Sequence, residues 1–298
     1  MDNISNERKE YRIGMICAVV SMVVWGFAPM YWRALVPIDS FVIIAYRIIF
    51  AAIICGIASL IVYGKEEMKK PLEDKKKVGI LFLAGFLITI NWSTYIYGVN
   101  SGQTIGANMG YYITPLLVSV AGLLFFKERL TKYKLTAIIL ALVGVLSMIV
   151  YFGSLPAITL TIAMSFAIYA VLKKYLKMKA IIALFYETLV FAIIAIVYLI
   201  YMETTGQGAL HVAQPHQIVM LIGSGVITAV PLALYAMATN RLNLVSVGVI
   251  QYLGPSLGIV VGFFVFREPF YLGQIIACII IWIGLAIFTY GEIQTARK

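Results

Sequence analysis

The chain has 298 residues, of which 62% are hydrophobic and only 12% are charged. A water-soluble domain has about half apolar and about a quarter charged residues, so this composition excludes a single soluble core and indicates that lipid surrounds much of the protein. The formal net charge of +10 does not indicate nucleic-acid binding, because the basic residues lie between apolar segments and form no single run.

Ten apolar segments follow one another along the chain, and each is long enough to cross a bilayer as a helix. They are residues 13–32, 40–63, 78–99, 104–126, 135–152, 155–172, 180–202, 217–239, 244–266 and 271–290. The first segment is too long for a signal-peptide core and no small-residue cleavage pattern follows it, so we expect the first span to be retained. The sequence therefore predicts an all-α integral membrane protein of ten transmembrane helices.

Basic residues alternate between the two sides of the predicted membrane. They cluster before the first span and after the second, fourth, sixth, eighth and tenth spans, with Lys173 opening the cluster after the sixth. Arg33 and Arg267 fall on the opposite side. Because positively charged loops stay in the cytoplasm, we expect both termini to be cytoplasmic, the loop with His211 to be external, and the location to be the cell membrane.

The second half of the sequence repeats the first at an offset of 140 residues. Identical residues align in the pairs Gly85 and Gly225, Tyr95 and Tyr235, Asn100 and Asn240, Tyr112 and Tyr252, Pro115 and Pro255, Gly122 and Gly262, and Gly144 and Gly284. Each half holds five spans, an odd number, so the second half must insert with the opposite orientation. We therefore expect two inverted five-helix repeats, over residues 12–152 and 153–291.

Inverted repeats are a recurrent design of secondary transporters, which bind substrate near the bilayer midplane between the halves. Two equivalent halves also allow two packings of similar energy, as alternating access requires. The sequence thus favours a transporter, and a receptor, a sensor or a structural membrane protein is the alternative. An enzyme is not indicated, because the G-x-S-x-G pattern at Gly254–Gly258 lies within a span and not at a strand-to-helix turn.

Two Tyr-x-x-Pro motifs lie in the middle of spans four and nine. At 1.5 Å per residue, Tyr112 and Tyr252 are about 12 Å inside a hydrocarbon core about 30 Å thick. Proline removes one helical hydrogen bond, so Pro115 and Pro255 are either hinges or plain packing kinks. The aromatic and amide residues at similar depth are Trp25, Asn91, Trp92, Tyr95, Asn108, Tyr169, Tyr235 and Gln251. Together with the two motif tyrosines, they are our candidate binding residues for a small amphipathic solute.

Two ionisable residues, Arg47 and Glu187, lie inside spans two and seven, at equivalent positions of the two halves. Such residues are costly in a membrane and are usually functional. Because a low-dielectric bundle disfavours a charged carboxylate, Glu187 is a candidate for proton coupling. The alternative is that each charge stabilises its own half through hydrogen bonds. A depth difference of roughly 10 Å does not favour a direct pair.

No Cys/His cluster indicates a metal site and no ATP-binding motif is present, so we expect no metal and no cofactor. The three cysteines, Cys17, Cys55 and Cys278, lie within apolar segments and are expected to be free thiols. Glycines recur every fourth residue from Gly102 to Gly110 and from Gly254 to Gly262. They predict close helix packing within one chain first and a homodimer interface second.

Eight segments carry a resemblance to a known family: Trp25–Pro29, Tyr46–Arg47, Asn91–Trp92, Gly110–Leu116, Phe152–Pro156, Ser165–Tyr169, Glu187–Leu189 and Gln251–Pro255. With these segments, the chain resembles the EamA family of the drug/metabolite transporter superfamily, and most closely its RarD-like members. The resemblance implies a cavity lined by helices one, three, four, six, eight and nine. It implies export of metabolites or drugs, and it leaves spans two and seven, with their charges, outside the lining.

Overall fold

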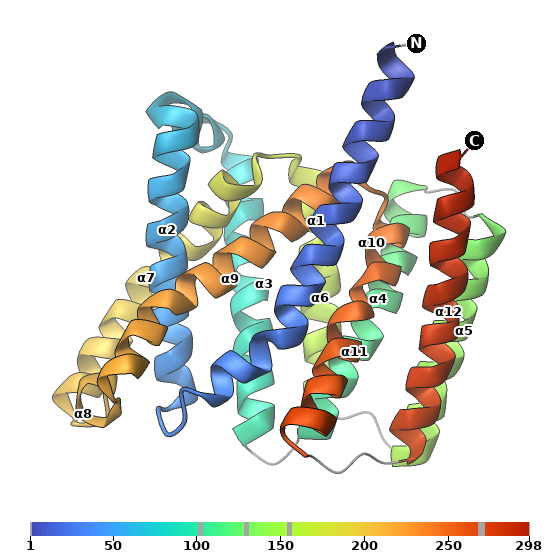
Figure 1. Cartoon of the computed structure of the whole chain (residues 1–298). Helices are drawn as coiled ribbons and strands as arrows, with labels where there is room; N and C mark the ends of the chain where they lie inside the picture. Colours follow the sequence, from blue (N-terminus) through green and yellow to red (C-terminus); the bar gives the residue numbers. More distant parts are fainter. Residues whose placement is uncertain (1, 101–103, 128–130, 154–156, 268–271, 298) are drawn as a thin grey trace.

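The computed structural model describes residues 2–100, 104–127, 131–153, 157–267 and 272–297. Within these ranges every regular element is a helix (Figure 1). In chain order they are α1 (Asp2–Arg33), α2 (Ser40–Lys69), η1 (Lys70–Glu73), α3 (Lys75–Asn100), α4 (Thr104–Phe126), α5 (Lys132–Phe152), α6 (Ala157–Leu176), α7 (Ala180–Thr204), α8 (Ala209–Val212), α9 (Pro215–Arg241), α10 (Leu244–Gln251), α11 (Leu253–Val260), η2 (Val261–Val265) and α12 (Leu272–Arg297).

The predicted spans are present as helices. Among the described residues, eight helices are long and apolar enough to cross a membrane, and two shorter apolar helices cover Gly110–Phe126 and Ile275–Gly291. Large apolar side chains on the outer helices are exposed, among them Ile61 at 79% and Val150 at 81%. A continuous apolar surface of this kind is unfavourable in water and suits lipid. The predicted all-α membrane fold is confirmed.

Helix ends lie where local sequence signals favour them. The Asp39 carboxylate accepts hydrogen bonds from the first turn of α2, the Thr131 hydroxyl caps α5, and the Asn243 side chain caps α10. Each cap satisfies a backbone N–H that the helix itself leaves unpaired. Gly153 ends α5 with a φ of 79°, a left-handed conformation that glycine adopts without a steric penalty. These signals separate neighbouring spans without breaking the apolar segments.

The helices pack symmetrically under exchange of the two halves. Equivalent helices pair with each other: α2 lies along α7, α5 lies along α12, and α4 lies against α10 (Figure 1). Several other contacts occur in matched pairs: α1 packs on α9 as α6 packs on α3, and α1 packs on α11 as α6 packs on α4. Two repeats of opposite orientation produce this pattern.

Glycines permit the closest approaches between helices of the same chain. A Cβ on Gly85 of α3 would lie 2.1 Å from the backbone oxygen of Glu187, and one on its repeat partner Gly225 would lie 2.6 Å from Phe50. A Cβ on Gly110 would lie 2.8 Å from Ile162. Within the predicted glycine series, Gly110 makes such a close approach, whereas a Cβ on Gly254 or Gly258 would meet its nearest neighbour only at 3.6 or 3.9 Å. Gly102 lies outside the described residues.

The ninth span is interrupted at Tyr252, three residues before Pro255. α10 ends at Gln251, α11 begins at Leu253, and the segment Val261–Val265 is a π-helix. Pro255 has no N–H to donate to the carbonyl of Gln251, so the helix loses a hydrogen bond at this point. Its repeat partner Pro115 lies inside the undivided helix α4. The two equivalent prolines therefore have different consequences for their helices.

Candidate functional site

Three of the predicted binding residues meet around Phe166 at the centre of the bundle. The ring of Trp25 on α1 lies 5.9 Å from that of Phe166 on α6 and 5.8 Å from that of Tyr235 on α9. The Phe166 ring lies 5.4 Å from Tyr235 and 5.7 Å from Tyr169. These tilted and edge-to-face arrangements are the ones that aromatic rings favour. We call Trp25, Phe166, Tyr169 and Tyr235 the central aromatic cluster.

An amide extends the central aromatic cluster toward the divided ninth span. Gln251 Nε2 donates a hydrogen bond to Tyr235 Oη over 3.1 Å. Gln251 Oε1 is buried and has no hydrogen-bond partner among the described residues. The two ends of an amide are interchangeable by rotation, so one polar atom of Gln251 stays unpaired in either orientation. An unpaired buried polar atom is costly and is available to a polar group of a bound solute.

Tyr112 and Tyr252 contact each other but lie apart from the central aromatic cluster. Their ring centroids are 6.4 Å apart, and both side chains are buried. Tyr112 Oη lies 3.0 Å from Cys278 Sγ on α12, and the two tyrosines share a separate apolar core with residues of α5 and α12. They therefore join α4, the divided ninth span and α12 at the contact between the halves.

The polar atoms of Asn91 bind other helices. Its Nδ2 donates to the Ile162 oxygen over 2.8 Å and to Ser165 Oγ over 3.1 Å, and its Oδ1 accepts a hydrogen bond from Tyr111 Oη over 3.3 Å. Asn91 thus fixes α3 to α6 and α4. The ring of Tyr95 lies 5.1 Å from that of Tyr111. The side chain of Asn108 lies outside the described residues.

Arg47 reaches from α2 to helices that line the predicted cavity. Its guanidinium carbon lies 4.2 Å from the ring centroid of Trp32 on α1 and 4.8 Å from that of Trp92 on α3. Arg47 Nε donates a hydrogen bond to Thr228 Oγ1 on α9 over 3.0 Å. The cation is thus held between two indole faces. Although α2 was expected outside the lining, its arginine contacts a candidate binding residue, Trp92.

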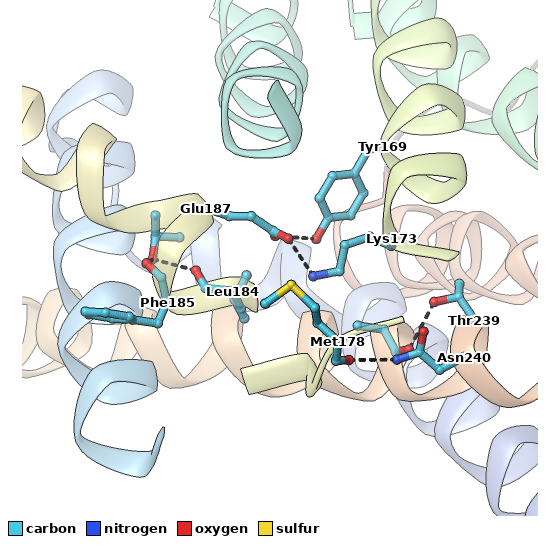
Figure 2. Close-up of polar contacts among 10 residues, drawn as sticks. Tyr169, Lys173, Met178, Leu184, Phe185, Glu187, Thr239 and Asn240 are labelled. Atoms are coloured by element: carbon cyan, nitrogen blue, oxygen red, sulfur yellow. Dashed lines mark hydrogen bonds and ion pairs between the residues drawn. The ribbon is translucent and has the colours of Figure 1, made fainter. Parts of the chain in front are cut away.

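Glu187 is paired with a lysine that the sequence had assigned to a loop. Figure 2 shows Lys173 Nζ and Tyr169 Oη both directed at the Glu187 carboxylate, at 2.7 Å and 3.1 Å. The Lys173 and Glu187 side chains are 3% and 0% exposed. The expectation that Lys173 lies in a loop after span six is therefore wrong, and Arg47 and Glu187 are not the only charges inside the bundle.

The sequence pattern predicted the wrong position for Lys173 for a simple physical reason. Hydropathy falls at the first lysine, whereas α6 continues to Leu176, since lysine is a good helix former and basic residues are favourable in the last turn of a helix. The long aliphatic stem of Lys173 then carries its ammonium group to Glu187. Phe166 was also missed as a site residue. Its position one turn before Tyr169 on the same span is the signal that indicates it.

Two surface pockets lie near η1 and the segment that follows Lys173. One of about 220 Å³ is lined by Asp74, Lys76, Lys77, Ile80, Tyr175 and Leu176. The other, of about 150 Å³, is lined by Glu67, Lys70, Pro71, Lys77, Met178, Lys179 and Ile182. Neither includes a residue of the central aromatic cluster, whose side chains pack directly against one another.

Comparisons with known proteins match almost the whole chain. The EamA-like transporter family matches twice, at residues 12–150 and 155–290. An uncharacterised transporter, YojE, of Bacillus subtilis (strain 168) is 34% identical over 98% of both chains. Protein RarD of Escherichia coli (strain K12) is 31% identical over 98% of this chain and 99% of its own, and protein RarD of Streptomyces exfoliatus is 30% identical over 97% and 92%.

A solved crystal structure of another protein has a similar fold. It matches with a TM-score of 0.72 and 15% sequence identity, over 96% of this chain and 99% of its own. At this level of identity the likeness concerns the fold alone. The arrangement of helices in Figure 1 is therefore one that an experimentally determined protein also adopts.

Proposed function

Because this chain belongs to the EamA-like transporter family, we propose that it is a secondary carrier that exports small amphipathic metabolites or drugs by alternating access. The observation that carries this proposal is the contact of Trp25, from the first half, with Phe166 and Tyr235, from the second. Carriers built from inverted repeats bind substrate between their halves near the midplane. The central aromatic cluster unites residues of both halves, which supports the proposal, and the proposed activity is transport without chemical conversion.

The cluster has the chemistry that an amphipathic solute requires. Three aromatic rings and one indole offer apolar faces, while the unpaired amide atom of Gln251 offers one polar contact. In the packed state seen here the side chains occupy the space themselves, as Tyr169 and Tyr235 are fully buried. Solute entry then requires α1, α6 and α9 to separate. The partly matched packing of the two halves, with α1 on α9 as α6 is on α3, supports such a motion.

The ion pair of Lys173 and Glu187 gives Glu187 a role in holding helices together. It joins α6 to α7, and through Tyr169 it also reaches the central aromatic cluster. Proton coupling through Glu187, one of the two interpretations of the sequence, therefore needs the pair to open. A proton on Glu187 would neutralise the carboxylate and remove its attraction for Lys173, which releases α6 from α7.

We propose that both termini are cytoplasmic and that the protein lies in the cell membrane. In Figure 1 the two chain ends lie on one face of the bundle and α8, which contains His211, lies on the opposite face. The loop rich in lysine around η1 is on the same face as the termini. Basic loops are retained in the cytoplasm, and this distribution supports the orientation. We also propose that the first repeat ends at residue 152 and the second begins at residue 153. The proposed oligomeric state is a monomer, with a homodimer as the alternative.

Transport is tested by reconstitution. The purified protein is inserted into liposomes, a library of metabolites and drugs is supplied on one side, and the solutes that cross are identified by mass spectrometry. Trp25→Ala serves as the site variant and Val150→Ala, at a residue 81% exposed on α5, as the matched surface control. We expect one or more solutes to cross with the wild type and the control and not with the site variant. Movement of none of them, together with a solute-dependent signal in cells, would favour a receptor.

A further inference from the structure

Arg47 is a cation inside the bundle, and in the described part of the chain it pairs with no carboxylate. Its contacts are the two indole rings of Trp32 and Trp92 and the hydroxyl of Thr228. Among the residues that the structure describes, no carboxylate forms an ion pair with it, whereas Glu187 at the equivalent position of the second half is paired with Lys173. The two equivalent charges thus differ in how they are compensated.

The protein satisfies only part of the hydrogen-bonding capacity of the Arg47 guanidinium group. Cation–π contacts stabilise a guanidinium, but they leave its N–H groups without acceptors. The single hydrogen bond to Thr228 uses Nε, and in the described part of the chain neither terminal nitrogen donates to a protein acceptor. Those two terminal nitrogens form the edge of the fork that matches a carboxylate in a bidentate pair.

Arg47 lies close to the residues of the proposed carrier site. Trp92, which stacks on its guanidinium, belongs to the same buried core as Phe166 and Tyr235. Asn91, the neighbour of Trp92 in the chain, is hydrogen bonded to Ser165, the neighbour of Phe166. Trp32 and Thr228, which contact Arg47, lie two helical turns, about 10 Å, from Trp25 and Tyr235 on the same helices, so one small molecule can place an anionic group at Arg47 and an apolar group in the central aromatic cluster.

We propose that Arg47 binds the carboxylate of the transported solute, so that the substrates are small organic monoanions with an apolar or aromatic body. This inference rests on the proposed carrier function and narrows its substrate class. One cation without a second one beside it matches a single negative charge, which disfavours phosphate monoesters and dicarboxylates. The two indoles and the central aromatic cluster supply the apolar surface for the rest of the molecule.

The test compares two probes that differ in charge and hardly in shape, 3-phenylpropionate and 3-phenylpropionamide. Binding to the purified full-length protein in nanodiscs is followed by tryptophan fluorescence, since Trp32 and Trp92 flank the arginine. We expect the acid to bind the wild type more tightly than the amide, by roughly 10- to 100-fold, as for hydrogen bonds to a charged group. Arg47→Gln should remove this preference and Arg47→Lys should keep part of it.

The matched control is Arg33→Gln, because Arg33 also stacks on an aromatic ring, that of Phe266, at 4.2 Å. This variant should retain the wild-type preference for the acid. The wild-type comparison needs no variant to fold, so it decides the matter by itself: equal affinities for acid and amide, or no binding of either, overturn the proposal. An unchanged preference in folded Arg47→Gln overturns it too. If liposomes transport only neutral or cationic solutes, the anion proposal fails while the carrier function stands.

Discussion

Lys173 and Glu187 form an ion pair of 2.7 Å in which both side chains are almost completely buried. The pair connects α6 with α7, and the hydrogen bond from Tyr169 to the same carboxylate connects it to the central aromatic cluster (Figure 2). In a low-dielectric bundle, charges are tolerated when they are paired and hydrogen bonded. The pair therefore determines how the charge of Glu187 is accommodated and how tightly α6 is held.

The first prediction concerns stability. Lys173→Met leaves the Glu187 carboxylate buried without a cation, so it should destabilise the protein by about 3–5 kcal/mol, the range for breaking a buried pair. The double variant Lys173→Met/Glu187→Leu should recover most of the loss, because no buried charge is left. Thermal unfolding in detergent measures both.

The control for this prediction is the exposed pair of Lys179 and Glu67, whose atoms are 2.8 Å apart. Lys179→Met should change the unfolding temperature little, because solvent screens an exposed pair. Equal decreases in unfolding temperature in Lys173→Met and Lys179→Met would show that the buried pair contributes no more to stability than the exposed pair.

The second prediction concerns coupling to protons. Glu187→Gln keeps the size of the side chain and removes its titration. If protonation of Glu187 opens the pair, this variant should still exchange a solute identified in liposomes but should not accumulate it when a pH difference is applied. The folded double variant Lys173→Met/Glu187→Gln should behave in the same way. Accumulation at the wild-type level in both variants contradicts coupling through this residue.

The third prediction concerns the central aromatic cluster. Tyr235→Phe removes the hydroxyl that accepts the hydrogen bond from Gln251 and should alter the affinity for solute moderately. Tyr235→Ala also removes ring contacts and should abolish transport. Initial transport rates are divided by the amount of folded protein in the liposomes, with Tyr201→Ala as the control at a residue 62% exposed. Loss of transport only in proportion to folded protein would argue against the cluster as the binding site.

The fourth prediction concerns orientation. His211→Cys should react with a membrane-impermeant thiol reagent added outside the cell, and Lys70→Cys should react only after the membrane is opened. The three native cysteines are buried and free, so they contribute a low background. Labelling of position 70 and not of position 211 in intact cells would reverse the proposed orientation.

The fifth prediction separates the two prolines. Pro255→Ala supplies the missing N–H next to the interruption between α10 and α11, so it should make the ninth span more continuous and slow the transport cycle. Pro115→Ala alters an undivided helix and should have the smaller effect on rate. Initial rates in liposomes test this order, and the hinge role of Pro255 fails if the two variants are equally fast.

The sequence by itself determined the class of fold. Apolar segments of membrane length, charges on alternate sides and the repeat of Gly85 and Tyr112 at Gly225 and Tyr252 required ten helices in two halves of opposite orientation. Each of these signals is local or is a comparison of the chain with itself, and none depends on which side chains touch. The predicted depth of Trp25, Tyr169 and Tyr235 also comes from position along a span, since a helix rises 1.5 Å per residue.

Only the tertiary structure decided which side chains meet. Depth does not specify the direction in which a residue points, because each step along a helix rotates it by about 100°, and the facing partner depends on how whole helices pack. For this reason Tyr112 and Tyr252, although predicted as binding residues, lie outside the central aromatic cluster, and Phe166 lies within it. Hydropathy is an average over a segment, and it takes no account of how far the long side chain of a lysine or an arginine extends. The pairing of Lys173 with Glu187, and the position of Arg47 between two indoles, therefore emerge only once α2, α6 and α7 are packed together.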